Sequence, residues 1–251
     1  MIEIFALSII QGITEFLPIS SSSHLILMSE FLNFTYKDIS IDISLHIGSF
    51  IAVVFYFNKE IINFYENKIL FFKVLIASLP VMIIGFFLVE SNYIEKIRSL
   101  EIIAWTTLIF GILLFISDKF KLENNMKNLN YKSIIFIGFL QIFSLIPGVS
   151  RSGIAITAAR FLKFKRVDAA KISFLISIPI LGAVSLFGLK NIILSGSAMF
   201  TQLNLIAIFL SFLFSLVTIK FFLSFINKFS LNIFIFYRIL LGFFLLALYY
   251  L

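Results

Sequence analysis

The sequence predicts an all-α polytopic membrane protein, and three observations support that prediction. Apolar residues account for 61% of the 251 residues, and charged residues account for only 13%. A soluble domain carries roughly a quarter charged residues, so this chain cannot cover itself with a polar surface. Runs such as 102–116 and 205–219 are almost continuously apolar, unlike the alternating strands of a β-barrel. With their flanks they reach the ~20 residues of a spanning helix, the form that satisfies the backbone in lipid.

Eight apolar blocks occur along the chain, and two of them are interrupted. The blocks cover about 2–31, 43–58, 69–89, 101–117, 132–162, 170–190, 202–226 and 231–251. Pro18 and four serines interrupt the first block, and Pro147 with a Ser-Arg-Ser run interrupts the fifth. Proline removes a helical donor, and serine offers the backbone competing hydrogen bonds. We therefore expect six plain spanning helices and two re-entrant hairpins, whose irregular turns need a covering of protein or water.

The order of the blocks suggests an inverted-topology repeat, because an interrupted block followed by three plain ones occurs twice. Gln11 precedes Pro18 by seven positions, and Gln141 precedes Pro147 by six. Each half is a re-entrant helical hairpin plus three transmembrane helices, an odd number, so the second half should insert upside down. Such folds place their site near the midplane, where the broken segments meet. The expected single transmembrane domain covers 1–251, with repeat one over about 1–120 and repeat two over about 131–251.

The basic residues of the predicted connections lie mostly on one side. Fourteen of them fall in 57–73, 118–132, 163–171 and 220–238. Four fall on the other side, at Lys37, Lys96, Arg98 and Lys190. The positive-inside rule makes the four segments cytoplasmic and opens the first hairpin to the outside. Arg160, within the fifth block, is expected to be a snorkelling helix-end residue. The net charge of +7 then indicates contact with anionic lipid and no nucleic-acid partner.

The first interrupted block contains an acidic motif. Gln11 and Glu15 are four residues apart and share a helix face. A carboxylate among apolar neighbours costs ~2.5–3.5 kcal/mol on insertion scales, so Glu15 needs a cation, a metal or water beside it. His24 closes the serine run and can change its charge near neutral pH. Together these groups have the chemistry to bind a divalent ion and to activate a serine or a water.

The second interrupted block contains a basic motif. Arg151 lies between Ser150 and Ser152 and is flanked by Gly148 and Gly153. Arginine binds phosphate oxygens through two parallel donors, and glycines let backbone amides approach an anion. A helix that begins after this turn adds the positive end of its dipole. The motif therefore predicts a phosphate cradle.

Each of these features also has a purely structural interpretation. Glu15 alone can pair with an arginine elsewhere, a run of serines can let helices pack closely in lipid, and His24 or His46 can be an interfacial residue. Pro80 and Pro179 most simply kink plain spans. We prefer the functional interpretation because both interrupted blocks hold a polar cluster, one acidic and one basic.

The two motifs resemble those of the bacterial undecaprenyl-diphosphate phosphatases of the BacA/UppP type, a family linked to bacitracin resistance. The first family motif, Glu or Gln, three residues, Glu and then a Pro-x-Ser-Ser segment ending in His, is similar to 11–24. The second, Pro-Gly-x-Ser-Arg-Ser-x-x-Thr, resembles 147–155, although Ala155 replaces the closing Thr and Thr157 follows two residues later. The similarity continues beyond the motifs and covers essentially the whole chain.

The resemblance implies hydrolysis of undecaprenyl diphosphate to undecaprenyl phosphate and phosphate, which recycles the lipid carrier of cell-wall polymer synthesis. It also implies a divalent cation, Mg²⁺ or Ca²⁺, and a multi-pass place in the bacterial cytoplasmic (inner) membrane with the active site facing the periplasm or exterior. The expected partners are the polyprenyl diphosphate substrate and membrane lipid, and a homo-oligomer is left open. The rival interpretation is a transporter or flippase of polyprenyl phosphate on the same fold.

On this hypothesis Arg151 neutralises the phosphates and Glu15 holds the metal. Ser21 is the candidate nucleophile with His24 as its general base or acid, and a metal-activated water is equally compatible. The expected substrate-binding residues are Gln11, Ser20, Ser22, Gly148, Ser150, Ser152, Gly153 and Thr157. Ala155 puts a hydroxyl contact to phosphate in question, since Thr157 lies on a different helix face.

Overall fold

The structure, a computed structural model, describes 2–31, 39–63, 67–91, 97–195 and 202–251. Within those ranges it contains helices and connections and no strand. The elements are α1 (Ile2–Thr14), α2 (Ser21–Phe31), α3 (Ile39–Tyr56), α4 (Asn58–Ile62), α5 (Lys68–Glu90), α7 (Leu100–Asp118), η1 (Met126–Asn128), α8 (Tyr131–Leu140), η2 (Gln141–Leu145), α9 (Arg151–Phe161), α10 (Arg166–Ser195), α11 (Gln202–Lys228) and α12 (Asn232–Tyr250). Five of the described helices are long and apolar enough to cross a membrane, namely α5, α7, α10, α11 and α12. The prediction of an all-α polytopic membrane protein is confirmed.

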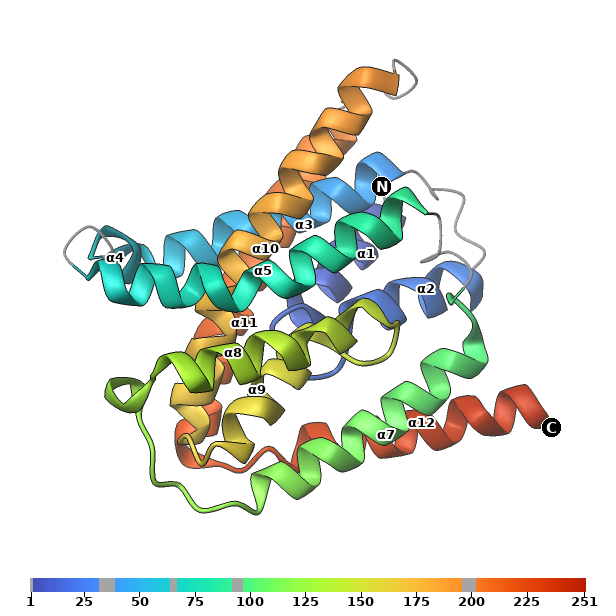
Figure 1. Ribbon diagram of the computed structural model, residues 1–251. Helices are drawn as coiled ribbons and strands as arrows, with labels where there is room; N and C mark the ends of the chain where they lie inside the picture. The colour runs from blue at the N-terminus through green and yellow to red at the C-terminus, as the bar shows by residue number, and fades with distance from the viewer. Residues whose placement is uncertain (1, 32–38, 64–66, 92–96, 196–201) are drawn as a thin grey trace.

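Both interrupted blocks form two short helices joined by a turn. In the first block the turn lies between α1 and α2, and in the second α8 passes through the 3₁₀ helix η2 before the turn into α9. At 1.5 Å per residue, the 13 residues of α1 and the 11 of α2 and α9 reach only about 20 and 16 Å, too short for a hydrocarbon core of about 30 Å. The turns lie near the middle of the molecule, between the longer helices (Figure 1).

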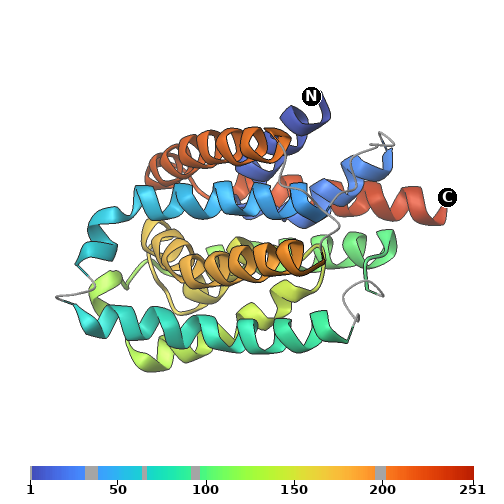
Figure 2. The ribbon, with the colours of Figure 1, turned by 90° about the horizontal axis from the view of Figure 1, so that it is seen from above.

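Helices of one half of the chain pack against helices of the other. The first hairpin meets α11 at Gly12, where an added Cβ would lie 2.5 Å from Phe214 Cβ. The second hairpin meets α5 at Gly138, where an added Cβ would lie 2.8 Å from the Ala77 carbonyl oxygen. Such small residues let helices approach closely in lipid. The last helices of the halves, α7 and α12, also pack together, and α10 lies between α3 and α5 (Figure 2). The opposite insertion of the two halves stays a prediction.

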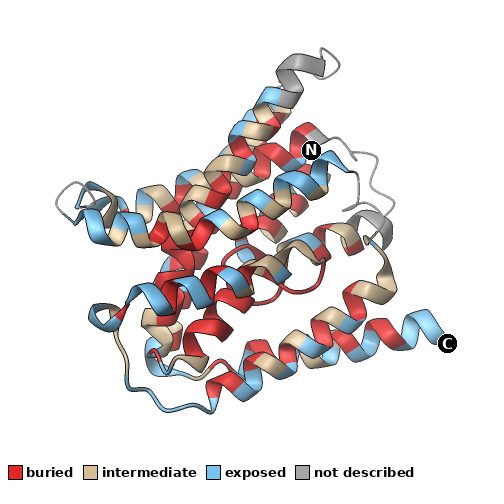
Figure 3. Ribbon diagram, viewed as in Figure 1, coloured by how far each residue is buried: buried red, intermediate tan, exposed pale blue. Residues whose placement is uncertain are grey.

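The outer surface is suited to lipid. Large apolar side chains project from the long helices, as at Val217 on α11 and Phe243 on α12, which are 66% and 58% exposed. The buried residues face the interior of the bundle and include the turns of both hairpins (Figure 3). Polar groups are therefore concentrated inside the molecule, as a lipid solvent requires.

The connections rich in basic residues gather at one end of the molecule. The α4 region and the α7–α8 connection lie at the end away from both termini (Figure 1). This matches the prediction that 57–73 and 118–132 share one side. Which end faces the cytoplasm stays a prediction.

Two arginines correct the charge analysis. Arg160 is not a snorkelling residue, because it is fully buried and its guanidinium donates to Asp118 and to main-chain carbonyls, including that of Phe164. Arg238, counted above among the residues of a connection, is fully buried on α12. In both cases backbone carbonyls compensate the buried charge, and a sequence does not display such partners.

Candidate active site

The two hairpin turns share an unusual backbone feature. Ser20 and Ser150 immediately precede α2 and α9, and both adopt positive φ angles, 75° and 70°. This left-handed region is uncommon for residues other than glycine, and it occurs often at functional sites. Ser150 also caps α9, since its Oγ accepts the Gly153 amide at 3.1 Å. The two turns are therefore built alike around a serine.

A buried glutamine lies nine positions before each of these serines. Gln11 precedes Ser20, Gln141 precedes Ser150, and neither glutamine is exposed. In each, the side-chain Oε1 has no hydrogen-bond partner among the described residues. The two motifs therefore align when they are counted from the serines, because both glutamines then have the same offset. Counted from the prolines, the offsets of the glutamines were seven and six.

An ion pair joins the two turns. Arg151 Nη2 lies 3.0 Å from Glu15 Oε1, and the two side chains are 12% and 6% exposed. The arginine begins α9, and the carboxylate follows the end of α1. The cation that Glu15 was expected to need is therefore supplied by the second motif, and the acidic and basic clusters form one site.

Ser21 is oriented by the carboxylate. Its Oγ donates to Glu15 Oε2 at 2.7 Å, and Gln11 Nε2 donates to the same oxygen at 3.2 Å. His24 lies elsewhere: its Nδ1 is 2.6 Å from the Ser20 carbonyl oxygen, and its Nε2 is 2.5 Å from the hydroxyl of Tyr237. The predicted pairing of Ser21 with His24 is not present, because Glu15 accepts the Ser21 hydroxyl and Tyr237 on α12 holds the imidazole.

Arg238, on α12, connects the turns from the other side. Its Nη2 donates to the Gly148 carbonyl at 2.9 Å, its Nη1 to the Pro18 carbonyl at 3.3 Å, and its Nε to the Thr107 carbonyl at 3.3 Å. Ser152 Oγ adds a second link by donating to the Leu17 carbonyl at 2.7 Å. Sequence reasoning missed Arg238. A charge seven residues inside the last apolar block was the available signal.

The two glycines of the basic motif make room for side chains. Gly148 has φ +94°, and a Cβ there would lie 1.9 Å from Thr106 Oγ1. A Cβ at Gly153 would lie 2.8 Å from Arg238 Nη1. The glycines were expected to let an anion approach the backbone. The contacts seen here are instead with Thr106 and Arg238, which hold the turn in place.

A model of the family described as bacitracin resistance protein BacA matches residues 4–244. The chain belongs to the BacA family. A protein named undecaprenyl-diphosphatase from Pelagibacter ubique (strain HTCC1062) is 49% identical to it over 252 residues, which cover 100% of this chain and 98% of that protein. A protein of the same name from Saccharophagus degradans (strain 2-40 / ATCC 43961 / DSM 17024) is 40% identical over 251 residues, covering 94% and 93%.

Other predicted residues of this BacA-family chain lie near the ion pair but bond to one another. Ser20 Oγ is 3.0 Å from Ser23 Oγ and 3.4 Å from Ser22 Oγ, and Ser150 Oγ is 3.2 Å from Ser152 Oγ. Of these hydroxyls, only that of Ser22 belongs to an exposed residue.

Ala155 and Thr157, farther along α9, lie away from the turn. Ala155 is fully buried in the apolar core, so a methyl group fills the space of the family threonine. The Thr157 hydroxyl donates to the Gly153 carbonyl at 2.8 Å within the same helix. Thr157 is six residues beyond Arg151, about 9 Å along the helix, and its substrate-binding role stays a prediction.

The oxygen atoms around Glu15 fit a divalent cation that the substrate helps to bind. Mg²⁺ commonly takes one or two carboxylates together with substrate phosphates, and both Mg²⁺ and Ca²⁺ prefer oxygen ligands. The Glu15 carboxylate and the unpartnered Gln11 Oε1 are oxygen ligands of this kind. In the part of the chain that the structure describes, no three His, Cys, Asp or Glu side chains gather as a ready-made metal cage.

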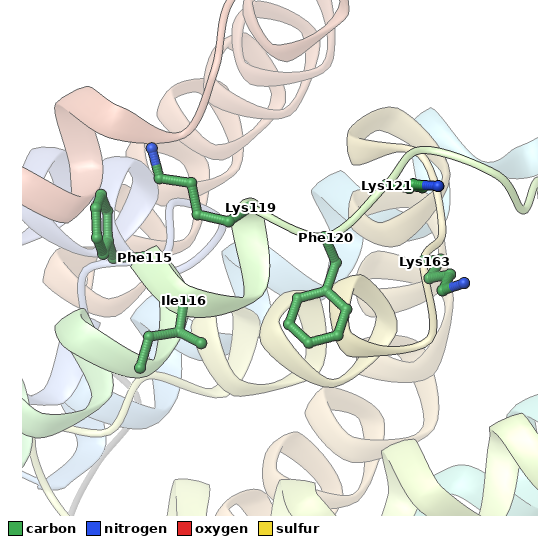
Figure 4. Close-up of a pocket in the computed structure, with 6 residues that line it drawn as sticks. All are labelled: Phe115, Ile116, Lys119, Phe120, Lys121 and Lys163. Atoms are coloured by element: carbon green, nitrogen blue, oxygen red, sulfur yellow. The ribbon is translucent and has the colours of Figure 1, made fainter.

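A separate cavity of about 500 Å³ lies at the end with the basic connections. Lys119, Lys121 and Lys163 line it together with Phe115, Ile116 and Phe120 (Figure 4). Lys163 is already paired with Glu123 at 3.0 Å. None of the motif residues lines this cavity. The Glu15–Arg151 pair, where the two motifs meet, is the candidate active site.

Proposed function

We propose that this chain hydrolyses undecaprenyl diphosphate to undecaprenyl phosphate and inorganic phosphate. The observation that best supports the proposal is the Glu15–Arg151 ion pair, which brings the acidic and the phosphate-binding motif within 3.0 Å inside a membrane protein. Family membership and the names of both relatives agree with this activity and favour it over the transporter interpretation. The product is the lipid carrier of cell-wall polymer synthesis in the bacterial inner membrane.

Phosphate recognition is the task of Arg151. Its Nη2 donates to Glu15, and its Nη1 reaches the Ser173 carbonyl only at 3.5 Å, so its donors are incompletely used. A diphosphate offers more negative charge and two parallel acceptors, the geometry that a guanidinium binds best. When Arg151 turns to the phosphates, it releases Glu15 Oε1, while Glu15 Oε2 keeps the Ser21 hydroxyl, whose proton it can accept.

The hydroxyl of Ser21 is the group placed to give that proton. In the proposed reaction Ser21 Oγ attacks the terminal phosphorus while Glu15 takes the hydroxyl proton. The Oγ–P bond forms, the bridging P–O bond breaks, and undecaprenyl phosphate leaves with the electron pair. Water then cleaves the phosphoserine ester and releases phosphate. Direct attack by a water that Glu15 and Ser21 hold is the alternative, and both routes use the contact of 2.7 Å between these residues.

His24 and Arg238 are proposed as positioning residues. His24 Nδ1 lies against the Ser20 carbonyl and fixes the residue that precedes Ser21. Arg238 holds the two turns at Pro18 and Gly148. A divalent cation, when bound by the Glu15 carboxylate and Gln11 Oε1, would neutralise charge on the phosphate oxygens.

The test is phosphate release from undecaprenyl diphosphate by the purified protein in detergent, with Mg²⁺ or Ca²⁺ added and with both removed by a chelator. We expect release by the wild type with either ion and none after chelation. Glu15→Ala and Arg151→Ala should lose activity. Retained activity in both variants would refute the assigned site, and lipid movement in vesicles without phosphate release would establish a transporter instead.

We further propose that 1–251 form one domain with an inverted repeat and that the site opens to the periplasm. The chain has no cysteine, so single cysteines can report the side directly. With a membrane-impermeant maleimide applied to intact spheroplasts, Ser22→Cys should be labelled and Lys121→Cys should not. The opposite pattern would reverse the assigned orientation.

A further inference from the structure

An apolar groove separates α5 from α10 in one half of the molecule. The helices meet where Ser78 Oγ donates to the Ile176 carbonyl at 3.0 Å. Beyond this crossing α10 leans away from α5, so the two helices diverge (Figure 1). Pro80 and Pro179 lie just past the crossing, inside the two helices, and proline bends a helix. A groove of about 660 Å³ occupies the space between the diverging segments.

The lining of the groove is apolar along its whole length. Residues 79–89 of α5 form one wall and 180–187 of α10 form the other. Phe86 and Phe187 meet edge to face across it, with ring centroids 6.1 Å apart. Gly85 lets the Leu145 side chain come close to the α5 wall, since an added Cβ would lie 3.2 Å from its end. This shape and chemistry suit a flexible hydrocarbon chain.

Two elements, η2 and α10, link the groove to the candidate active site. Leu145, at its base, ends η2 and lies two residues before Pro147 of the basic turn. On α10, Ser173 accepts from Arg151, and Ile180 of the groove follows seven residues later on the same helix. Seven residues span about 10 Å, so the groove begins about that far from the phosphate-binding arginine.

The position of the groove across the membrane also agrees with the proposed orientation. It lies in the halves of α5 and α10 that are distant from Lys68 and Arg166, the basic residues at which these helices begin. In the proposed orientation this half faces the outer leaflet. A substrate whose diphosphate enters from the periplasm has its hydrocarbon chain at this depth.

We infer that the α5–α10 groove binds the prenyl chain of the substrate, beginning at the isoprene units a few positions from the diphosphate. The inference rests on the proposed function for the identity of the substrate. It assigns Gly85, Ala183, Phe86 and Phe187 to chain recognition. The short chain of farnesyl diphosphate reaches only the start of the groove, whereas an undecaprenyl chain fills it.

The kinetic test uses substitutions that fill the groove and compares their effects on undecaprenyl diphosphate and farnesyl diphosphate. Gly85→Leu and Ala183→Trp should each lower kcat/KM for undecaprenyl diphosphate by at least about tenfold more than for farnesyl diphosphate, through KM, because lost methylene contacts are worth 10–200-fold. Val217→Trp, on the exposed surface of α11, is the matched control and should change neither value. Equal losses for both substrates, or no loss for either, would overturn the inference.

Photo-crosslinking tests the inference without requiring turnover. An undecaprenyl diphosphate analogue with a diazirine in its fourth isoprene unit should label 79–89 and 180–187 of the wild type, and Ala183→Trp should reduce that labelling. Labelling of α7 and α12 instead would place the chain elsewhere and overturn the inference, even if phosphate release is normal. Labelling of the groove without phosphate release would refute the proposed function and leave the groove assigned to the chain.

Discussion

Glu15 and Asp118 are both buried carboxylates paired with arginine, and they differ in how completely their partners are bonded. Asp118 Oδ1 accepts from Arg160 Nε at 3.3 Å, and both Asp118 oxygens accept from Arg166, at 2.8 and 2.9 Å. Arg160 directs its two other nitrogens to main-chain carbonyls, including those of Phe120 and Phe164. All three nitrogens of this guanidinium are used.

The Glu15 pair leaves bonding capacity open. Among the described residues, Arg151 makes one bond of normal length, to Glu15, and one contact of 3.5 Å to Ser173. Next to it, Gln11 Oε1 has no partner among the described residues. Burial and pairing are therefore common to both carboxylates, and the bonding of the paired arginine distinguishes the candidate ligand site from the cluster that holds helices together.

The contrast between the Glu15 and Asp118 pairs would be wrong if Arg151 had only a structural role. Arg151→Ala should lower kcat/KM for phosphate release by about 10³-fold, because a guanidinium that binds a transferring phosphoryl group contributes on this scale. The unfolding temperature in detergent should fall less than in Asp118→Ala, because Glu15 keeps the hydrogen bonds from Ser21 and Gln11. A variant with more than a tenth of wild-type activity would contradict the assignment, and Arg151→Lys should recover only part of the loss, since lysine cannot donate in the same fork.

At Asp118, the other buried carboxylate, a substitution should lower stability and leave activity nearly unchanged. Asp118→Ala leaves Arg160 buried without its acid, which costs about 3–5 kcal/mol of folding free energy. The unfolding temperature should fall clearly, while kcat/KM of the folded fraction at low temperature should stay close to that of wild type. Normal stability with lost activity would show that the cluster of Asp118, Arg160 and Arg166 also takes part in the reaction.

A substitution at Ser21 distinguishes the two proposed chemical routes, attack by the serine and direct attack by water. If Ser21 is the nucleophile, Ser21→Ala should lower kcat by at least about 10²-fold, and a phosphorylated protein should be trapped by acid quenching of the wild type. Ser91→Ala is the control, since this exposed serine at the end of α5 lies outside both motifs. A loss below about tenfold, with no trapped phosphoserine, would favour direct attack by water.

The smallest effect is expected at Tyr237. Tyr237→Phe removes the hydroxyl that lies 2.5 Å from His24 Nε2 but keeps the stacked ring. One hydrogen bond is worth about 0.5–1.5 kcal/mol, so kcat/KM should fall by less than about tenfold. A loss as large as that of Arg151→Ala would place Tyr237 in the reaction itself.

The sequence predicted the helices and both turns because their causes are local. Proline and serine interrupt the first and fifth blocks. Five of the six plain blocks correspond to the long helices, and the block at 43–58 forms the shorter α3. Glu15 and Arg151 were identified because a charge in an apolar segment needs a reason. Their direct pairing across 136 positions depends on how α1 and α9 pack, and no local pattern specifies that.

The errors arose where tertiary contacts override a plausible local interpretation. Arg238 was assigned to a connection because it stands near the start of a span, yet α12 packs against α7 and directs it inward. His24 was assigned to Ser21 because the two are close in sequence. Each group instead has a partner outside α2: the Ser21 hydroxyl donates to Glu15, and the His24 ring lies against Tyr237, 213 positions away.

Arg238 also sets the order in which the protein can become functional. Both motifs precede α12 in the chain, yet the carbonyls of Pro18 and Gly148 are held by a residue of that helix. During synthesis the chain therefore contains every reacting group before α12 has entered the membrane, but their arrangement is incomplete. We therefore expect a nascent protein of this kind to be inert toward lipid diphosphates until its closing span is inserted.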